Sequence, residues 1–200
     1  MTNALLDIFG RTMRWIVRFR KRRGYGVHSP FAFGMITGVV YEKGCYYAYE
    51  DIKKIYHKEH PKASPWRWKD YKFLFRLANF QHPQEALIVD KRGDKVLREA
   101  LTKGCQHCNF YLVDCGNLPS NKKYDFIMVT EGWECQAPVL LSLLREGGML
   151  VVKGLARRQR TAWNALLKQS EAQVTFDLYD FGILFNRPTL QRQRYVVNYW

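Results

Sequence analysis

The second half of the chain alternates short apolar runs with stretches of helical length, and this rhythm constrains the fold more than any other feature. The runs ALIV, NFYLV, FIMV and MLVV are expected as strands over residues 86–89, 109–113, 126–129 and 149–152. Helices are expected over residues 94–102, 138–145 and 161–170. Strands that are apolar throughout are buried on both faces, which is typical of parallel sheets covered by helices. The pattern therefore predicts an α/β fold with a mainly parallel sheet.

The end of the chain is richer in strands than the part before it. Further strands are expected over residues 174–179, 183–185 and 195–200, with no helix between them. Strands that follow one another without a crossover helix pair in antiparallel fashion. The ending therefore predicts an antiparallel edge strand on the otherwise parallel sheet.

The first 80 residues read as helices. Ser29 and Pro30 provide a serine cap and a proline at the first helical position, which predicts a helix over residues 30–40. Two more helices are expected over residues 50–60 and 69–80, and HPKASPW between them reads as a linker because of its two prolines. We therefore expect a helical N-terminal extension over residues 1–80 and a Rossmann-like domain over residues 81–200.

Positive charge is concentrated near the N-terminus. The chain has 32 Lys and Arg against 18 Asp and Glu, a net charge of +14, and seven of the basic residues lie within the first 23. Apolar and basic side chains recur there at helical spacing, which predicts an amphipathic helix over residues 3–22. The basic residues that recur at spacings of three and four are Arg11, Arg14, Arg18 and Arg22.

This basic helix has three interpretations that the sequence leaves open. It is a solvated face, a binding element for a nucleic-acid backbone, or an element that adsorbs to an anionic membrane surface. The chain has no run of the ~18 apolar residues that a membrane-spanning helix needs. Its first residues also lack the pattern of a signal peptide. We therefore expect a cytoplasmic protein, peripheral at the membrane if the third interpretation holds.

Several segments together resemble a known family. KYDFIMVTEG, a helix, REGGMLVVKGL and VTFDLYDFGILF resemble the second half of a class I S-adenosylmethionine-dependent methyltransferase. In that fold a strand runs from YD to an acidic residue, and a parallel strand and a reversed one finish the sheet. RGYGVHSPFAF and KFLFRLANFQHPQEALIV further resemble a bacterial group of methyltransferase-like proteins with a helical N-terminal extension. The resemblance covers residues 24–200 and implies S-adenosylmethionine as the cofactor.

The sequence departs from this family where the cofactor would bind. The family has a glycine-rich loop after the first strand, whereas LIVDKRGDKVLREAL has Gly93 alone, preceded by Lys91 and Arg92. Bulk and positive charge are unfavourable beside a sulfonium cation, and only glycines let the backbone approach a ligand closely. The chain between Asp90 and Asp125 is also too short for the family's two strands and two helices. We therefore expect a fold shortened by about one strand–helix unit, with a decayed cofactor site and no bound cofactor.

Other candidate site residues follow from the resemblance and from their places after strands. Asp114 follows a strand where the family has the carboxylate that binds the ribose hydroxyls, although a turn residue would also suit this place. Glu131 matches a family Asp at a strand end, Gly132 would allow close approach, and Trp133 could stack on a planar group. The candidate cofactor-binding residues are thus Asp90, Gly93, Asp114, Glu131, Gly132 and Trp133, with no catalytic residue among them.

Cysteines, one histidine and several aromatics offer weaker signals. Cys105 and Cys108 form a single C-x-x-C, whereas a zinc site needs four ligands, so ordinary reduced thiols and no metal are expected. His28 lies in the GVHSPF motif, where anchoring local hydrogen bonds is favoured over a place above the cofactor. Several aromatic residues lie near basic residues, and we expect their rings to pack within the protein rather than to stack on nucleic-acid bases. These residues are Tyr46, Tyr47, Tyr49, Trp66 and Trp68.

Two functions from different classes follow. The first is an active S-adenosylmethionine-dependent methyltransferase whose substrate the sequence does not identify. The second, favoured by the LIVDKRGDK loop, is a methyltransferase-like binding or scaffold protein that uses its basic surface on an anionic partner. A fold by itself does not establish an activity.

Overall fold

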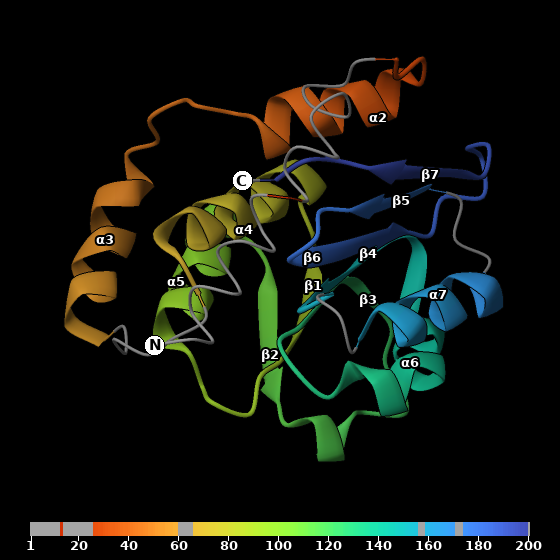
Figure 1. Ribbon diagram of the computed structural model, residues 1–200. Helices are drawn as coiled ribbons and strands as arrows, with labels where there is room; N and C mark the ends of the chain where they lie inside the picture. Colours follow the sequence, from red (N-terminus) through yellow and green to blue (C-terminus); the bar gives the residue numbers. More distant parts are fainter. Residues whose placement is uncertain (1–12, 14–25, 60–65, 156–158, 171–173, 200) are drawn as a thin grey trace.

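The computed structural model describes residue 13 and residues 26–59, 66–155, 159–170 and 174–199 (Figure 1). The basic helix predicted over residues 3–22 lies outside the described residues, apart from Met13, which is helical and half-exposed. Most of the predicted 60–66 linker lies outside them too.

The elements alternate as the sequence predicts. The helices are α2 (Pro30–Met35), the π-helix η2 (Ile36–Val40), α3 (Ala48–Glu59), α4 (Trp68–Gln81), α5 (Lys95–Gly104), the 3₁₀-helix η3 (Cys115–Asn117), α6 (Trp133–Ser142) and α7 (Arg160–Gln169). The strands are β1 (Glu85–Val89), β2 (Asn109–Val113), β3 (Tyr124–Val129), β4 (Leu144–Lys153), β5 (Val174–Asp177), β6 (Phe181–Phe185) and β7 (Gln193–Val196). None of the described helices is long and apolar enough to cross a bilayer.

The strands form one seven-stranded sheet in the order β2-β1-β3-β4-β6-β5-β7. Neighbours β2, β1, β3 and β4 pair in parallel, and β5 pairs with β7 in parallel. Strand β6 is antiparallel to both β4 and β5. The predicted reversed strand is therefore present, but it lies inside the sheet, because β5 and β7 add outside it.

The connection between β2 and β3 is short, as we expected from the small number of residues between Asp90 and Asp125. It holds η3 and no α-helix. The sheet is thus Rossmann-like and mainly parallel, and the parallel strand β5 and the reversed strand β6 follow β4. Strand β2 lies at the edge of the sheet, with its side chains largely exposed.

Helices cover both faces of the sheet, and each face has its own core. On one face α2, α4 and α5 pack on residues such as Ile88, Met128 and Val151 (Figure 1). On the other face α6 and α7 pack on their neighbours Val89, Val129 and Val152. Because side chains alternate along a strand, fully apolar strands supply both cores. The helices before Pro83 thus share a core with the sheet.

The start of α6 differs from its prediction. The helix begins at Trp133, five residues before the predicted start at Pro138, which lies inside it. Gly132 has φ +73° and serves as the N-cap, a left-handed conformation that favours glycine. By contrast, α2 begins as predicted, with the Ser29 side chain accepting a hydrogen bond from the Ala32 N–H at 3.3 Å.

Candidate functional site

The carboxyl edge of the parallel strands is where ligands bind in open α/β sheets, and the loop after β1 is its first component. Asp90 follows β1 directly and is buried. Its Oδ2 accepts a hydrogen bond from the Asp94 N–H at 2.6 Å, and its Oδ1 accepts from the Arg92 N–H at 3.4 Å. Oδ1 also accepts from the Thr130 hydroxyl at 2.9 Å. The carboxylate thus occupies the inside of the turn and accepts hydrogen bonds from two of its backbone amides.

The N-terminus of α5 is likewise capped by the chain itself. Oδ1 of Asp94 accepts a hydrogen bond from the Leu97 N–H at 3.0 Å, and Oδ2 accepts from the Tyr71 hydroxyl at 2.8 Å. Gly93, just before it, has φ +64° and closes the turn. A helix N-terminus attracts anions through its unpaired N–H groups. Here a side-chain carboxylate already lies on it.

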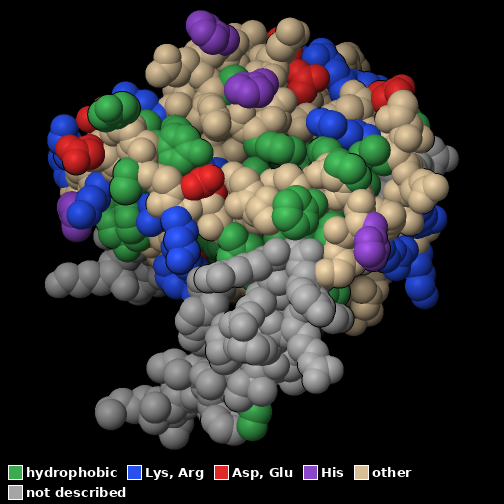
Figure 2. Space-filling model, turned by 90° about the horizontal axis from the view of Figure 1, so that it is seen from above, with side chains coloured by type: hydrophobic (Ala, Val, Ile, Leu, Met, Phe, Trp, Pro, Cys, Tyr) green, Lys and Arg blue, Asp and Glu red, His purple; other side chains and the backbone are tan. Residues whose placement is uncertain are grey.

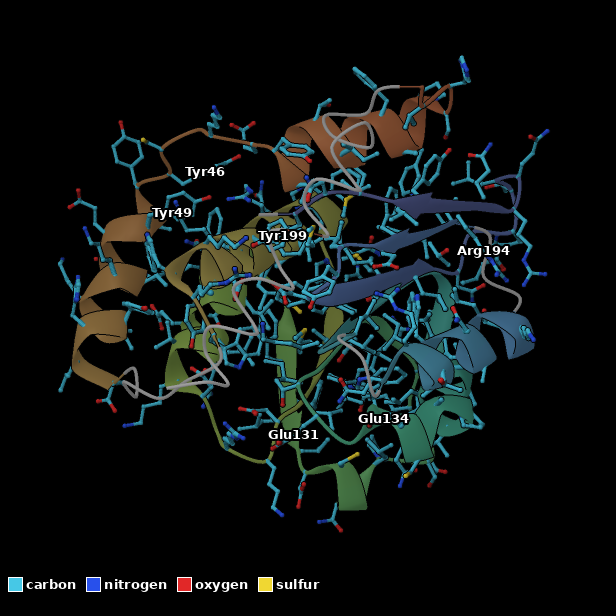
Figure 3. All side chains as sticks on the ribbon, in the orientation of Figure 1. Tyr46, Tyr49, Glu131, Glu134, Arg194 and Tyr199 are labelled. Carbon is cyan, nitrogen blue, oxygen red and sulfur yellow. The ribbon has the colours of Figure 1, made fainter. Side chains whose placement is uncertain are left out.

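An ion pair joins the loop after β1 to the loop after β3. The Arg92 guanidinium lies 3.7 Å from the Glu131 carboxylate, with 65% and 39% of the two side chains exposed. Such an exposed pair contributes little stability. It nevertheless places a cation next to the candidate carboxylate. Glu131 and Glu134 lie together at the lower edge of the sheet (Figure 3).

Asp114 is the most accessible of the predicted carboxylates. It follows β2, its side chain is exposed, and its Oδ1 accepts a hydrogen bond from the Cys115 N–H at 2.7 Å. It therefore caps η3, the turn role that the sequence also allowed. Its exposure leaves room for the ribose-binding role that the resemblance implies, a role that stays a prediction.

The residues after Glu131 are differently placed. A Cβ on Gly132 would lie 3.2 Å from the Cys115 sulfur, which donates a hydrogen bond to the Gly132 carbonyl at 3.3 Å. Trp133 is fully buried, packs edge-to-face on Trp163 at 6.3 Å and donates its Nε1–H to the Lys153 carbonyl at 3.2 Å. A ring without exposed surface cannot stack on a ligand. The stacking role predicted for Trp133 is therefore not possible in this conformation.

Two of the five thiols, Cys108 and Cys115, have environments that disfavour the thiolate. Burial raises the pKa of Cys108 to about 12, assisted by the negative charges of Cys105, Asp125 and Glu85. Burial and the neighbouring Asp114 likewise raise the pKa of Cys115. All five cysteines are free. Among the residues with described positions, no group of three or more His, Cys, Asp or Glu side chains is arranged to hold a metal ion.

His28 and the aromatics lie away from these residues. His28 is exposed just before α2, and Phe31 of α2 contacts Phe185 at a ring distance of 5.0 Å. Phe185 pairs with Met149, near the amino edge of the sheet, opposite to the candidate site. This placement does not support a role for His28 above the cofactor.

Of the aromatic residues near basic residues, Tyr46 and Tyr49 pack within the protein, as the sequence analysis predicts, and Tyr47 does not. Tyr46 and Tyr49 lie on Phe75 at ring distances of 5.1 and 5.2 Å. Tyr47 is fully exposed.

A buried charge cluster at the end of β4 was not predicted. The Lys153 ammonium lies 3.3 Å from Asp70 of α4, and above the rings of Trp66 and Phe181 at 4.3 and 4.4 Å. Asp70 also accepts from the Tyr199 hydroxyl at 3.3 Å. The sequence offered one signal for this cluster, the lysine that ends the apolar run MLVVK. Its partner Asp70 could not be identified from the sequence, because it lies in α4, far away along the chain. These charges neutralise each other inside the protein.

Comparisons with known proteins give the following similarities. No family model matches the sequence, and no curated protein matches it. A methyltransferase from Geobacter sulfurreducens is 11% identical, with a TM-score of 0.48 over 80% of this chain and 98% of that one. The Podospora anserina methyltransferase PaMTH1, solved with S-adenosylhomocysteine, has 11% identity and a TM-score of 0.48 over 80% and 97%. The O-methyltransferase TomG from Streptomyces achromogenes, solved with S-adenosylmethionine, has 12% identity and a TM-score of 0.46 over 72% and 91%.

Proposed function

We propose that this chain is a methyltransferase-like protein that has lost cofactor binding and acts as a binding or scaffold protein for an anionic partner. The observation that carries the proposal is the position of Asp90. Its carboxylate accepts the N–H groups of Arg92 and Asp94 in the loop that would face the methionine part of S-adenosylmethionine. These donors are engaged within the protein.

The residues around this loop do not fit the cofactor. The methionine carboxylate of S-adenosylmethionine would meet the carboxylates of Asp90 and Asp94, and like charges at short distance repel. The sulfonium would lie near Arg92 and Lys91, which are exposed cations on the same loop. The carboxylate and the sulfonium of the cofactor would therefore each meet a charge of their own sign, whereas its ammonium group would not.

A basic surface supports the second half of the proposal. The net charge of +14 favours anionic partners. The N-terminal basic residues contribute to this charge, but they lie outside the described part. Nucleic acid and an anionic membrane surface are the partner classes that the composition suggests.

A second candidate function, an active S-adenosylmethionine-dependent methyltransferase, rests on Asp114. Its exposed carboxylate follows β2, where the resemblance places the ribose-binding acid. A carboxylate there can accept two hydroxyl hydrogen bonds. Glu131 and Gly132 lie on the loop after β3 at the same edge of the sheet.

Calorimetric titration separates the two functions. S-adenosylmethionine and S-adenosylhomocysteine are titrated separately into the purified full-length protein, and we expect no binding heat with either. Micromolar affinity for either compound would overturn the decayed-site proposal. Asp114→Asn would then identify the ribose contact, with Glu50→Gln on α3 as the control at another exposed carboxylate.

A further inference from the structure

Two arginines lie side by side at the start of the last strand of the sheet. Arg194 is in β7, Arg192 is the residue directly before β7, and both side chains are exposed. Residues two apart in a strand point to the same side and are separated by roughly 6.8 Å. Figure 3 shows Arg194 at the right-hand end of the sheet, far from Glu131 at the lower edge.

The protein holds both guanidinium groups in place without neutralising them. The Arg192 guanidinium donates to the carbonyls of Leu167 at 2.8 Å and Ser170 at 3.3 Å. The Arg194 guanidinium donates to the Leu167 carbonyl at 3.2 Å. These carbonyls belong to the C-terminal end of α7 and carry no formal charge. Each guanidinium has five N–H donors, so most of them stay available for a ligand.

One further cation lies beside these arginines. Lys168 is exposed in the last turn of α7 and directly follows Leu167, whose carbonyl accepts hydrogen bonds from both guanidinium groups. Arg187, which follows β6, does not belong to this group, because its guanidinium lies 4.7 Å from the centre of the Phe31 ring, on the face of the sheet that α2 covers. We call Lys168, Arg192 and Arg194 the arginine patch.

No carboxylate compensates the arginine patch within the described part of the chain. None of its three residues takes part in the ion pairs found there. The described acidic residues of the same region, Asp177 and Asp180, pair with Arg160 and Arg67. Seen from above, Lys and Arg side chains lie along both the left and the right margins of the molecule (Figure 2).

The chemistry of the patch favours phosphate groups over a bilayer. Guanidinium groups bind phosphate oxygens bidentately, and a nucleic-acid backbone presents phosphates at a regular repeat. Membrane adsorption needs apolar side chains that insert. The large hydrophobic residues exposed among the described residues include none from α7 or β7; they are Met13, Phe33, Tyr47, Tyr111, Leu112 and Val139.

We propose that the arginine patch binds the phosphodiester backbone of a nucleic acid. The inference rests on the proposed function, which assigns an anionic partner, and it specifies the partner and the surface. Because the contacts are to phosphates, binding is independent of base sequence and falls with rising salt.

The test measures fluorescence anisotropy of labelled 20-nucleotide single strands and 20-base-pair duplexes between 50 and 200 mM NaCl. The variant Arg192→Gln/Arg194→Gln removes two charges from the patch. We expect at least a fivefold weaker affinity at low salt and a slope of log K against log salt smaller by about 1 to 2. The matched control Lys53→Gln/Lys58→Gln removes two exposed charges from α3, at the other end of the molecule, and is expected to change affinity less than twofold.

A second variant keeps the test informative if the loss of Arg192 and Arg194 disturbs α7. Lys168→Gln removes the flanking cation and spares the bonds to the Leu167 carbonyl. We expect it to weaken binding and to reduce the slope of log K against log salt by about 1. Thermal unfolding of each variant identifies any loss of fold.

Three outcomes would overturn the proposal. They are no binding of the wild-type protein at 50 mM salt, equal losses in the patch and α3 variants, or competition by polyglutamate as strong as by an oligonucleotide of equal charge. Preferential binding to phosphatidylserine vesicles would point to a membrane instead. None of these results depends on S-adenosylmethionine, because the patch lies toward the opposite edge of the sheet from Asp90. The calorimetric test of the decayed site therefore succeeds or fails separately.

Discussion

Nζ of Lys153, the last residue of β4, lies 3.3 Å from Oδ2 of Asp70 in the first turn of α4. Both side chains are buried, and Tyr199 near the end of the chain donates a hydrogen bond to the same carboxylate. Arg67, just before α4, pairs with both Asp70 and Asp180. The cluster thus joins the helical extension, the sheet and the end of the chain through compensated charges.

Replacing Lys153 with methionine tests how much this cluster stabilises the fold. The variant leaves Asp70 buried without its closest ammonium, and breaking a buried pair from one side costs about 3–5 kcal/mol of unfolding free energy. Urea denaturation followed by tryptophan fluorescence measures the change. Lys53→Met on α3, an exposed lysine, is the control and is expected to stay within about 0.5 kcal/mol. A decrease in the unfolding free energy of less than about 1 kcal/mol for Lys153→Met would contradict the prediction, because loss of one partner of a buried pair is expected to be larger.

The same cluster predicts a loss of stability in acid. Burial raises the pKa of Asp70, but the positive charges of Lys153 and Arg67 outweigh it, and the net pKa lies below the ordinary value. A carboxyl group with a lowered folded pKa stabilises the fold fully above its unfolded pKa, roughly 3.9, and loses this contribution as the pH falls through the folded value. Urea unfolding between pH 5 and 2 should therefore show a stability decrease that Asp70→Asn makes shallower. Parallel curves for the two proteins would refute this origin.

Cys108 should be the slowest thiol to alkylate. Its pKa of about 12 leaves almost no thiolate at pH 8, and the thiolate is the reactive species. Cys45 and Cys135 are exposed and should react first. Iodoacetamide labelling of the native protein, followed by peptide mass spectrometry over time, measures the order. Rapid labelling of Cys108 would instead indicate a reactive C-x-x-C pair.

The central strands β1, β3 and β4 were predictable because each contains a run of apolar side chains that only a two-sided core can bury. Ile88 and Val89 show this, since they enter opposite cores of the sheet. The internal position of β6 was not predictable in the same way, because strand order depends on which edges remain free. The start of α6 was missed because Pro138 resembles a first helical residue, while the left-handed Gly132 carries no such signal in its sequence.

The candidate site was predictable in position but not in its bonding. Loop residues after strands must lie at the carboxyl edge, so Asp90, Asp114 and Glu131 could be placed from strand ends. Which donors Asp90 accepts depends on the backbone path of the turn, and a sequence does not specify this path. The burial of Trp133 depends on Trp163, a residue of α7 thirty positions away. The Asp70 partner of Lys153 is more distant still in the sequence.

Gly104 should be intolerant of alanine. It ends α5 against α4, and a Cβ there would lie 2.4 Å from the Phe75 carbonyl oxygen and 2.9 Å from Cβ of Ala78. The backbone of α4 would have to move, and overpacking of this kind costs about 1–3 kcal/mol. Gly116→Ala is the control, because no atom lies within 4 Å of its added Cβ. Equal melting temperatures for the two variants would show that the α4–α5 contact adjusts freely.

Removal of residues 1–22 should lower the affinity for polyanions and change the free energy of unfolding of the sheet domain little. The segment carries six of the seven N-terminal basic residues, and each neutralised phosphate releases counterions that drive association. We expect lower affinity for oligonucleotides or anionic vesicles and a shallower salt dependence. The matched full-length variant replaces Arg11, Arg14, Arg18 and Arg22 with glutamine, so it loses the charge and keeps the apolar side chains. If truncation unfolds the sheet while this variant stays folded, the apolar stripe belongs to the core. If neither change alters binding, the N-terminal charge is not the binding element and the arginine patch remains to account for it.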